Sequence, residues 1–364
     1  MTTSLARTVT SDRPELGWHH HADGTFRKTM PRPRADTEHR GWQQLRGLLP
    51  IPDLLSRRDL GDRSTLIYQD VFARGRCRGL LADVITEADA DPSQTPRVRA
   101  LVDAVCDNWQ LAYQRTGQKV PLSACVPALY AGRLRPRGRL DRWYGSTRPL
   151  TVATPGRGYS LDLPDLLGRL RTILTPASLW PSAITQGDPT EPNIACDELC
   201  WLDFEHAGRN SIAGEAAVMF WYLAGMGGWL VPAYQPATYA RTVHRRAATT
   251  RPALRHLHID GDHIEVDAAL TAGPGRRAAL QTLLVRLDTD LADRLAPPAL
   301  DPRTALGPWL ALRILGVIPL SSLSRADAAI CLALLGRALD PAVSLSDLIT
   351  DASGTPHAAH NAVR

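Results

Sequence analysis

The sequence predicts a two-lobed α+β fold, with a small strand-rich N-terminal lobe and a larger, mainly helical C-terminal lobe. The chain has 364 residues and is 44% hydrophobic, which is enough for more than one compact core. Strand patterns gather before residue 72, and amphipathic helix patterns follow it. We therefore expect an N-terminal lobe at residues 1–72, a C-terminal lobe at 73–350 with a cleft between them, and a disordered tail at 351–364.

The composition argues against some classes of binding partner and indicates a cellular location. The 42 basic and 37 acidic residues give a net charge of +5, but they are mixed along the chain, so no nucleic-acid groove is indicated. Lys28 and Lys119 are the only lysines, and a lysine kept in an arginine-rich background suggests a specific role. Six cysteines without CxxC spacing and a start without an apolar signal region favour reduced thiols and a cytoplasmic location.

The first strands are predicted in GWHHHADGTFRKTMPRP, on either side of the turn Asp23-Gly24. Phe26, Lys28 and Met30 share one face of the second strand because side chains alternate along a strand. The ammonium group of Lys28 is therefore expected to emerge from an otherwise apolar surface.

The neighbouring histidines leave a metal site open as an alternative. His19 and His21 could meet one ion, whereas His20 would point to the opposite face.

A helix is expected after the break at Pro31 to Pro33, with Asp36 as its N-cap and Glu38 in its first turn. LPIPDLL then predicts a stiff connector, and STLIYQDVF predicts a strand rich in branched and aromatic residues. The Gly-punctuated stretch ARGRCRG is typical of a hinge.

The C-terminal lobe contains two clear amphipathic helix patterns, RVRALVDAVCDNWQLAYQRTG and LDLPDLLGRLRTILTP. The five arginines of AGRLRPRGRLDRWYG between them are expected in a solvated loop, with anion binding as an alternative. LHIDGDHIEV predicts a hairpin. Three glycines and Pro232 interrupt the uncharged stretch Ala216–Tyr234, so a buried helix followed by a Gly-rich loop is favoured over a membrane span.

A further hairpin is predicted around the acidic turn Asp197-Glu198-Leu199. If Cys196 faces Cys200, then Asn193 faces Asp203 at the open end, and the opposite face of the ribbon is apolar. An amide oxygen and a carboxylate within reach of one cation suit Mg²⁺.

Asp188 precedes this hairpin on a Pro-containing loop. A carboxylate close to a bound cation stays ionised and can accept or orient a hydroxyl proton. Taken singly, Asp188 could start a turn, Asn193 could be a turn amide and Asp203 could cap a helix. The three spacings together, with the isolated Lys28 upstream, favour a functional site.

The run Gln186-Gly187-Asp188-x-x-x-x-Asn193, followed by Leu202-Asp203-Phe204-Glu205, resembles the catalytic signature of aminoglycoside phosphotransferases and their choline-kinase-like relatives. The lysine strand, the helix glutamate, the connector and a hinge-like segment at Tyr68–Phe72 follow the same layout, over roughly residues 14–225. The resemblance implies a protein-kinase-like fold. It also implies transfer of the γ-phosphate of ATP or GTP to a hydroxyl of a small molecule, such as an antibiotic or a secondary metabolite.

The resemblance further implies a role for each candidate residue. Asp188 is the expected base or hydroxyl-orienting group, and Asn193 and Asp203 are the expected Mg²⁺ ligands. The expected nucleotide-binding residues are Lys28, which would hold the phosphates, its partner Glu38, and Gln69 and Val71 of the hinge-like segment. Phosphoryl transfer depends on positioning and charge neutralisation, which these groups can supply.

Two positions depart from the family pattern. Gln186 stands where the family has a histidine, and its amide can support the loop in that histidine's place. Glu215 stands near the position where an acidic residue usually follows the metal-binding acid, and here it is Glu in place of Asp. A kinase-like nucleotide-binding or scaffold protein without turnover is the alternative that Gln186 favours. A protein kinase is disfavoured because no Asp-Phe-Gly or activation-segment pattern follows Asp203. Neither a membrane nor a nucleic-acid partner is expected, and the oligomeric state stays open.

Overall fold

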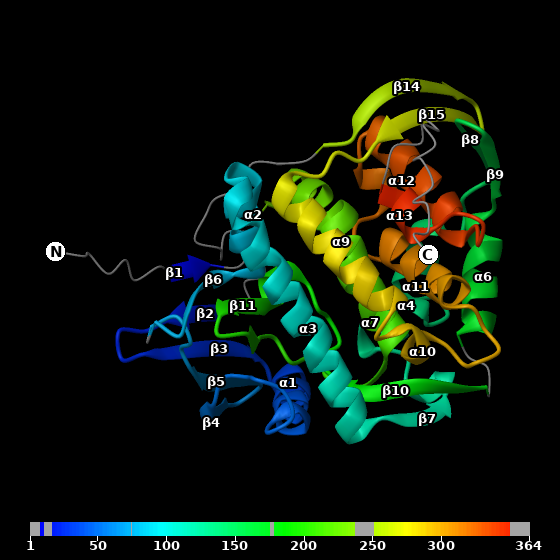
Figure 1. Cartoon of the computed structure of the whole chain (residues 1–364). Helices are drawn as coiled ribbons and strands as arrows, with labels where there is room; N and C mark the ends of the chain where they lie inside the picture. Colours follow the sequence, from blue (N-terminus) through cyan, green and yellow to red (C-terminus); the bar gives the residue numbers. More distant parts are fainter. Residues whose placement is uncertain (1–7, 11–16, 74, 175–177, 237–250, 350–364) are drawn as a thin grey trace.

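The structure is a computed structural model that describes residues 8–10, 17–73, 75–174, 178–236 and 251–349. An antiparallel sheet near the N-terminus is followed by a mainly helical remainder with smaller sheets (Figure 1), which confirms the predicted fold class. The predicted tail, residues 351–364, lies outside the described residues. The lobe boundaries at 72 and 350 stay predictions.

The N-terminal sheet has the strand order β1-β2-β3-β5-β4, and all its pairs are antiparallel. Its strands are β1 (Thr8–Thr10), β2 (Gly17–His20), β3 (Thr25–Pro31), β4 (Leu54–Leu60) and β5 (Arg63–Gln69). The predicted hairpin is present as β2 and β3, with Gly24 at a φ of 76° in the turn. Lys28 and Met30 are both buried beneath the sheet, as the alternation on β3 predicts.

Helix α1 (Arg32–Leu45) packs against this sheet and begins earlier than predicted. Pro31 is its N-cap and Pro33 lies in the first turn, where a proline is tolerated because the first N–H groups have no helical partner. The predictions that Asp36 caps the helix and that Glu38 lies in its first turn are therefore wrong. Glu38 lies in the second turn, on the buried face.

The same helix approaches a distant segment of the chain. A Cβ on Gly41 would lie 2.0 Å from the backbone oxygen of Phe204, so only glycine allows this contact. Helix α1 is thus packed directly against the segment that carries Asp203.

The helical remainder contains the two predicted amphipathic helices as α3 and α6. Its helices are α2 (Leu81–Ala90), α3 (Thr95–Thr116), α4 (Ala128–Leu134), α5 (Arg139–Tyr144), α6 (Leu163–Ile173), α7 (Ile212–Trp221), α8 (Val231–Tyr234), α9 (Pro274–Asp288), α10 (Ala292–Leu295), α11 (Pro302–Gly316), α12 (Arg325–Leu339) and α13 (Leu345–Ile349). Shorter segments are the 3₁₀ turns η1 (Pro92–Gln94), η2 (Leu122–Ala124), η3 (Glu191–Asn193) and η6 (Leu320–Ser322), and the π-helical η4 (Tyr222–Leu230).

The arginine-rich stretch between α3 and α6 is not the solvated loop that its composition predicts. It forms α4 and α5, which Leu134, Leu140 and Tyr144 anchor in the core. The arginines dominate the composition, but these apolar residues decide the structure because their burial provides the driving force.

The apolar stretch Ala216–Tyr234 is a core helix, as predicted, but its second half is not a loop. Helix α7 continues through the π-helical η4 into α8, and Gly227 allows η4 to approach the carboxylate of Glu191 closely. Among the described residues, Ile212–Tyr234 is the one helix long and apolar enough to cross a membrane, and 89% of its apolar window is buried inside the protein. Such burial is typical of a core helix.

Three small sheets complete the remainder, with the orders β12-β11-β6, β13-β10-β7 and β14-β15-β8-β9. Their strands are β6 (Cys77–Leu80), β7 (Gln118–Pro121), β8 (Leu150–Thr154), β9 (Arg157–Leu161), β10 (Leu179–Thr185), β11 (Ile194–Asp197), β12 (Cys200–Trp201), β13 (Gly208–Ser211), β14 (Ala253–Asp260) and β15 (His263–Ala269). Strands β14 and β15 form the predicted LHIDGDHIEV hairpin. Strand β6 overlaps the C-terminal part of the stretch expected to be a hinge.

The β11–β12 hairpin differs from the predicted register by one residue. Ala195 faces Cys200, so four residues separate the paired positions of β11 and β12. Of these, Cys196 and Asp197 pair with β6 instead, and Glu198 and Leu199 form the turn. The third strand, β6, draws Asp197 into the sheet, and this partner was not predicted.

The prediction that only one face of this ribbon is apolar also differs from the structure. Cys196 and Cys200 are core packing, as predicted, but the observed register places them on opposite faces: Cys200 lies with Ala195, and Cys196 lies with Trp201. All four side chains are buried. The ribbon is enclosed on both faces, and its polar residues lie at the turn and at the open end.

Candidate active site

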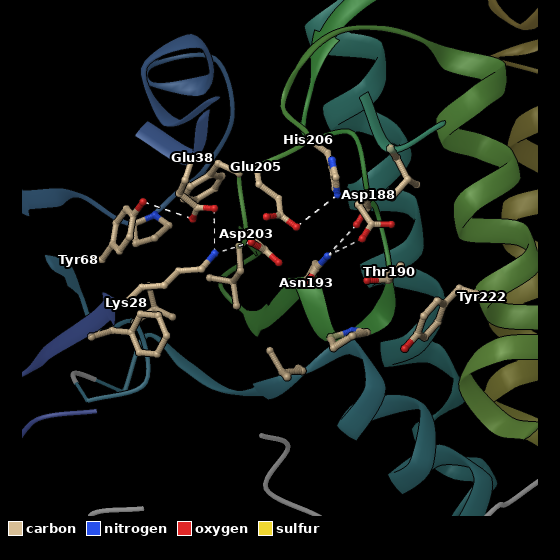
Figure 2. Close-up of a pocket in the computed structure, with 18 of the residues that line it drawn as sticks. Lys28, Glu38, Tyr68, Asp188, Thr190, Asn193, Asp203, Glu205, His206 and Tyr222 are labelled. Carbon is tan, nitrogen blue, oxygen red and sulfur yellow. Dashed lines mark hydrogen bonds and ion pairs between the residues drawn. The ribbon is translucent and has the colours of Figure 1, made fainter. Parts of the chain in front are cut away.

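A cavity of about 360 Å³ lies between the N-terminal sheet and the helical remainder. All seven residues selected from the sequence line it, together with residues from α4, η4, α8 and α11. Figure 2 shows Lys28, Glu38 and Asp203 on one side of it and Asp188 with Asn193 on the other. The structure therefore brings these residues together although up to 175 positions separate them in the chain.

Lys28 is the centre of a buried ion cluster. Its Nζ lies 2.9 Å from Oε2 of Glu38 and 2.5 Å from Oδ1 of Asp203. The hydroxyl of Tyr68 donates to the other oxygen of Glu38 at 3.4 Å. One ammonium group thus links the sheet, helix α1 and the segment after β12.

The charges of this cluster determine one another. Burial alone would lower the pKa of Lys28, but the carboxylates of Asp203 and Glu38 outweigh it and raise that pKa above its usual value. Burial would raise the pKa of Asp203, yet the contact with Lys28 holds it below its usual range. Burial raises the pKa of Glu38 above its usual range. Lys28 and Asp203 therefore form the charged pair, and Glu38 is the weaker acid.

Gln186 joins the segment of Asp188 to the segment of Asp203. Its Nε2 donates to the backbone oxygens of Leu202, at 2.8 Å, and Asp203, at 2.6 Å, while its Oε1 accepts from the N–H of Asp188 at 2.8 Å. Asp203 has a φ of 60°, an uncommon conformation for a residue other than glycine. The buried amide supports that conformation from both sides.

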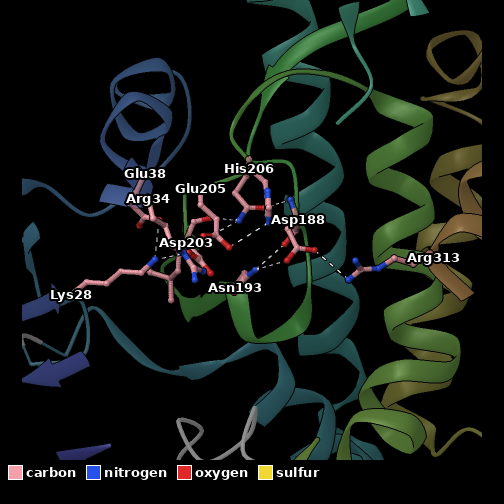
Figure 3. A network of polar contacts seen from close by, with 11 residues as sticks. Lys28, Arg34, Glu38, Asp188, Asn193, Asp203, Glu205, His206 and Arg313 are labelled. Carbon is pink, nitrogen blue, oxygen red and sulfur yellow. Dashed lines mark hydrogen bonds and ion pairs between the residues drawn. The ribbon is translucent and has the colours of Figure 1, made fainter. Parts of the chain in front are cut away.

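Asp188 lies between an amide and a guanidinium group (Figure 3). Nδ2 of Asn193 donates to the backbone oxygen of Asp188 at 2.9 Å, and Nη2 of Arg313 donates to its Oδ1 at 3.3 Å. Asn193 is thereby oriented, and its own Oδ1 is left available as a ligand. A structural role for Asp203 as a helix cap does not hold, since Ser211 caps α7.

The donor set fits a magnesium ion. Asp203 offers a carboxylate and Asn193 an amide oxygen at the same cavity, and Mg²⁺ prefers a few hard oxygen ligands with phosphate and water in its other positions. No group of three or more His, Cys, Asp or Glu side chains suited to a metal occurs among the described residues, which include His19 and His21.

Glu215 stabilises the turn that precedes Asp188. Its Oε1 accepts from the hydroxyl of Thr185 and from the N–H of Gly187. Gly187 has a φ of 88°, and a Cβ there would lie 2.0 Å from the backbone oxygen of His206. Burial raises the pKa of Glu215 to about 7, against the hydrogen bonds that favour its charged form.

This buried carboxyl predicts a specific pH dependence of stability. Its pKa is higher in the folded than in the unfolded chain, so the folded state loses stability as pH rises from about 4.5 to about 7, and the loss is constant above that range. The Glu215→Gln variant lacks this loss. We expect its free energy of unfolding, relative to the wild type, to improve by up to about 3 kcal/mol between pH 4.5 and pH 7.5.

Urea unfolding of both proteins across this pH range measures the difference. Glu38 also has a raised pKa, but it is present in both proteins and cancels in the comparison. Parallel stability curves for the two proteins would show that Glu215 does not change its charge in this range.

Several cavity residues were not selected from the sequence. Glu205 receives Arg34 of α1 as a partner and lies 3.4 Å from Nε2 of His206. Arg313 lies on the side of Asp188 that is remote from Lys28 (Figure 3), and Arg133 also lines the cavity. A signal was available for Arg313, because it is the one charge in the apolar run PWLALRIL. Arg133 was assigned to a solvated loop.

The comparisons with known proteins give similarity in structure only. No protein-family profile and no curated sequence matches the chain. An aminoglycoside phosphotransferase from Streptomyces rimosus is 14% identical, with 76% of this chain and 92% of that chain covered and a TM-score of 0.37. A glucosamine kinase in complex with glucosamine, ADP and inorganic phosphate is 14% identical, with 95% and 79% covered and a TM-score of 0.43.

An aminoglycoside-3'-phosphotransferase of type VIII is 17% identical, with 58% of this chain and 79% of that chain covered and a TM-score of 0.38. The chain is therefore similar to phosphotransferases that act on small molecules. At these identities and TM-scores, the functional assignment has to rest on the cavity itself.

Proposed function

We propose that this chain is a small-molecule kinase of the kind that its catalytic run resembles. It would transfer the γ-phosphoryl group of ATP or GTP to a hydroxyl of a small molecule in the cytoplasm. The observation that carries the proposal is the convergence of Lys28, Asp203, Asn193 and Asp188 on one cavity, with Gln186 joining the two loops.

Each residue has a distinct role in this proposal. Lys28, oriented by Glu38, would bind the nucleotide phosphates, and Asn193 and Asp203 would hold Mg²⁺, which neutralises phosphate charge when bound. Asp188 would orient the acceptor hydroxyl and accept its proton. Positioning and fixed charge of this sort supply most of the catalysis in phosphoryl transfer.

The nucleotide base would lie against the end of β5 and the segment that follows it. Gln69 and Val71 line the cavity there, and the N–H of Val71 has no hydrogen-bond partner among the residues that the structure describes. A free backbone donor beside a cavity suits the edge of a purine ring, which carries acceptor nitrogens.

The contacts of Gln186 support turnover over the alternative of a nucleotide-binding protein without activity. A histidine at this position would support the loop with ring nitrogens, and the amide supplies two donated bonds and one accepted bond instead. The six cysteines, all buried and unpaired, support a reducing cytoplasm.

Two measurements test the proposal. MgATP and MgGTP are first titrated against the wild type and the Asp203→Ala variant, with the unfolding temperature as the readout; a shift confined to the wild type is expected. The protein is then incubated with γ-labelled nucleotide and a panel of hydroxylated metabolites. Label transfer that Asp188→Ala abolishes supports the kinase. Binding without transfer to any acceptor supports the inactive alternative, and no nucleotide-dependent shift contradicts both.

A further inference from the structure

The half of the cavity beyond Asp188 has a composition of its own. Its walls come from α4, η4, α8 and α11 and from the residues that directly follow the last two. The apolar residues there are Leu129, Met226, Val231 and Val317. The only ionised groups that these elements contribute to the cavity, among the described residues, are the guanidinium groups of Arg133 and Arg313.

Some donor groups of these two arginines lack acceptors within the part of the chain that the structure describes. Arg313 is only 3% exposed, and it contacts Asp188 through Nη2 while its buried Nε has no hydrogen-bond partner in the described part of the chain. Nη1 of Arg133 is also buried and has no partner among the described residues. Buried donors without acceptors are costly, so two such groups at one cavity call for an acceptor from outside the chain.

The electrostatic balance points in the same direction. Burial and the positive charge of Arg313 together lower the pKa of Arg133 to about 10, while Asp188 acts in the opposite sense. One carboxylate thus faces two guanidinium groups, and this carboxylate is also the group proposed to accept a proton. An additional anion would relieve the repulsion between the arginines and leave Asp188 free for the hydroxyl.

We propose that the acceptor of this kinase is an anionic hydroxyl compound, whose carboxylate or phosphate is bound by Arg133 and Arg313 while its hydroxyl meets Asp188. This inference rests on the proposed function and adds the substrate class. The apolar wall formed by Met226, Val231 and their neighbours suits a short hydrocarbon body between the two groups. A polycationic antibiotic is disfavoured, because it would meet two buried positive charges on this side of the cavity.

The test compares acids with uncharged analogues of the same shape. Glycerate, lactate and glycerol 3-phosphate are paired with glyceramide, lactamide and glycerol, and kcat/KM for phosphoryl transfer is measured for each. Charge-assisted hydrogen bonds predict a preference for the acid on the order of 10- to 100-fold. Equal rates within each pair, or faster transfer to the neutral compound or to a polyamine sugar, would overturn the inference while leaving the kinase proposal in place. Transfer to a carboxylate but not to a phosphate, or the reverse, identifies which anion fits.

Variants of two arginines close in sequence separate binding from folding. Arg133→Met is expected to raise KM for the acid about tenfold or more, with the nucleotide-dependent thermal shift retained. Arg135→Met is the matched control, since Arg135 follows α4 but is exposed, and it should behave as the wild type. A loss in Arg133→Met that affects acid and neutral acceptors equally would contradict a binding role.

Anion binding can be tested even if no acceptor is phosphorylated. In that case the proposed activity fails, and the thermal shift caused by glycerate or inorganic phosphate is compared between the wild type and Arg133→Met. A shift that requires Arg133 supports an anion site at this position, and no shift with either anion rules it out.

Discussion

Replacement of Asp188 by asparagine is expected to reduce the rate of phosphoryl transfer by about 10²- to 10⁴-fold, with little change in MgATP affinity. The amide has the shape of the carboxylate, and its oxygen can still accept from Arg313, so the local structure should persist. What the variant loses is the group that accepts the hydroxyl proton. Steady-state kinetics with labelled ATP and nucleotide titration of the same preparation measure the two quantities separately.

An exposed aspartate provides the control. Asp293, whose side chain is 76% exposed, forms an ion pair with Arg294, and Asp293→Asn should leave both the rate and the affinity unchanged. A rate within a few-fold of the wild type in Asp188→Asn would remove Asp188 from the proposed mechanism and assign it a purely structural role.

Replacement of Lys28 by methionine is expected to have the largest combined effect on stability and nucleotide binding. Removal of the ammonium group leaves Glu38 and Asp203 facing each other without a cation, and loss of one partner from a buried ion pair costs roughly 3–5 kcal/mol. The phosphates would also lose their positive partner. Urea unfolding gives the free energy of unfolding, and MgATP titration gives the affinity.

A second substitution distinguishes the two effects. In the double variant Lys28→Met, Glu38→Gln, one of the two carboxylates is neutral, so we expect much of the stability to return while nucleotide binding stays lost. Glu38→Gln alone should be mild, because burial already raises the pKa of this carboxyl. Recovery of MgATP binding in the double variant would show that Lys28 does not hold the phosphates.

The sequence predicted the elements in which a regular spacing of hydrophobic residues is bounded by residues typical of turns or helix ends. The β2–β3 hairpin and helices α3 and α6 are of this kind, since their hydrophobic spacing and terminal residues agree. Strand β10 was not predicted because Pro181 lies within it, and a proline normally argues against a paired strand. Strands β8 and β9 were missed although Gly156, at a φ of 74°, marks the turn between them.

The predictions that were wrong near the site failed because they depend on contacts between distant parts of the chain. The register of β11 depends on β6, a partner more than a hundred residues away that local patterns do not reveal. The arginines of α4 looked solvated because composition records charge and not burial, and the apolar residues between them decide the packing. The site residues themselves could be selected because each has a distinctive chemistry or lies in a short motif, although up to 175 positions separate them, while Arg313 reaches the cavity only through the folding of α11.

The buried amide of Gln186 has a consequence for the working range of the protein. An imidazole at this position would gain a proton within the pH range of a living cell, and one of its acceptor sites would then become a donor facing the N–H of Asp188. An amide does not titrate, so the three bonds that tie the two loops persist from mildly acidic to alkaline conditions. A fall in pH over this range therefore leaves this junction unchanged.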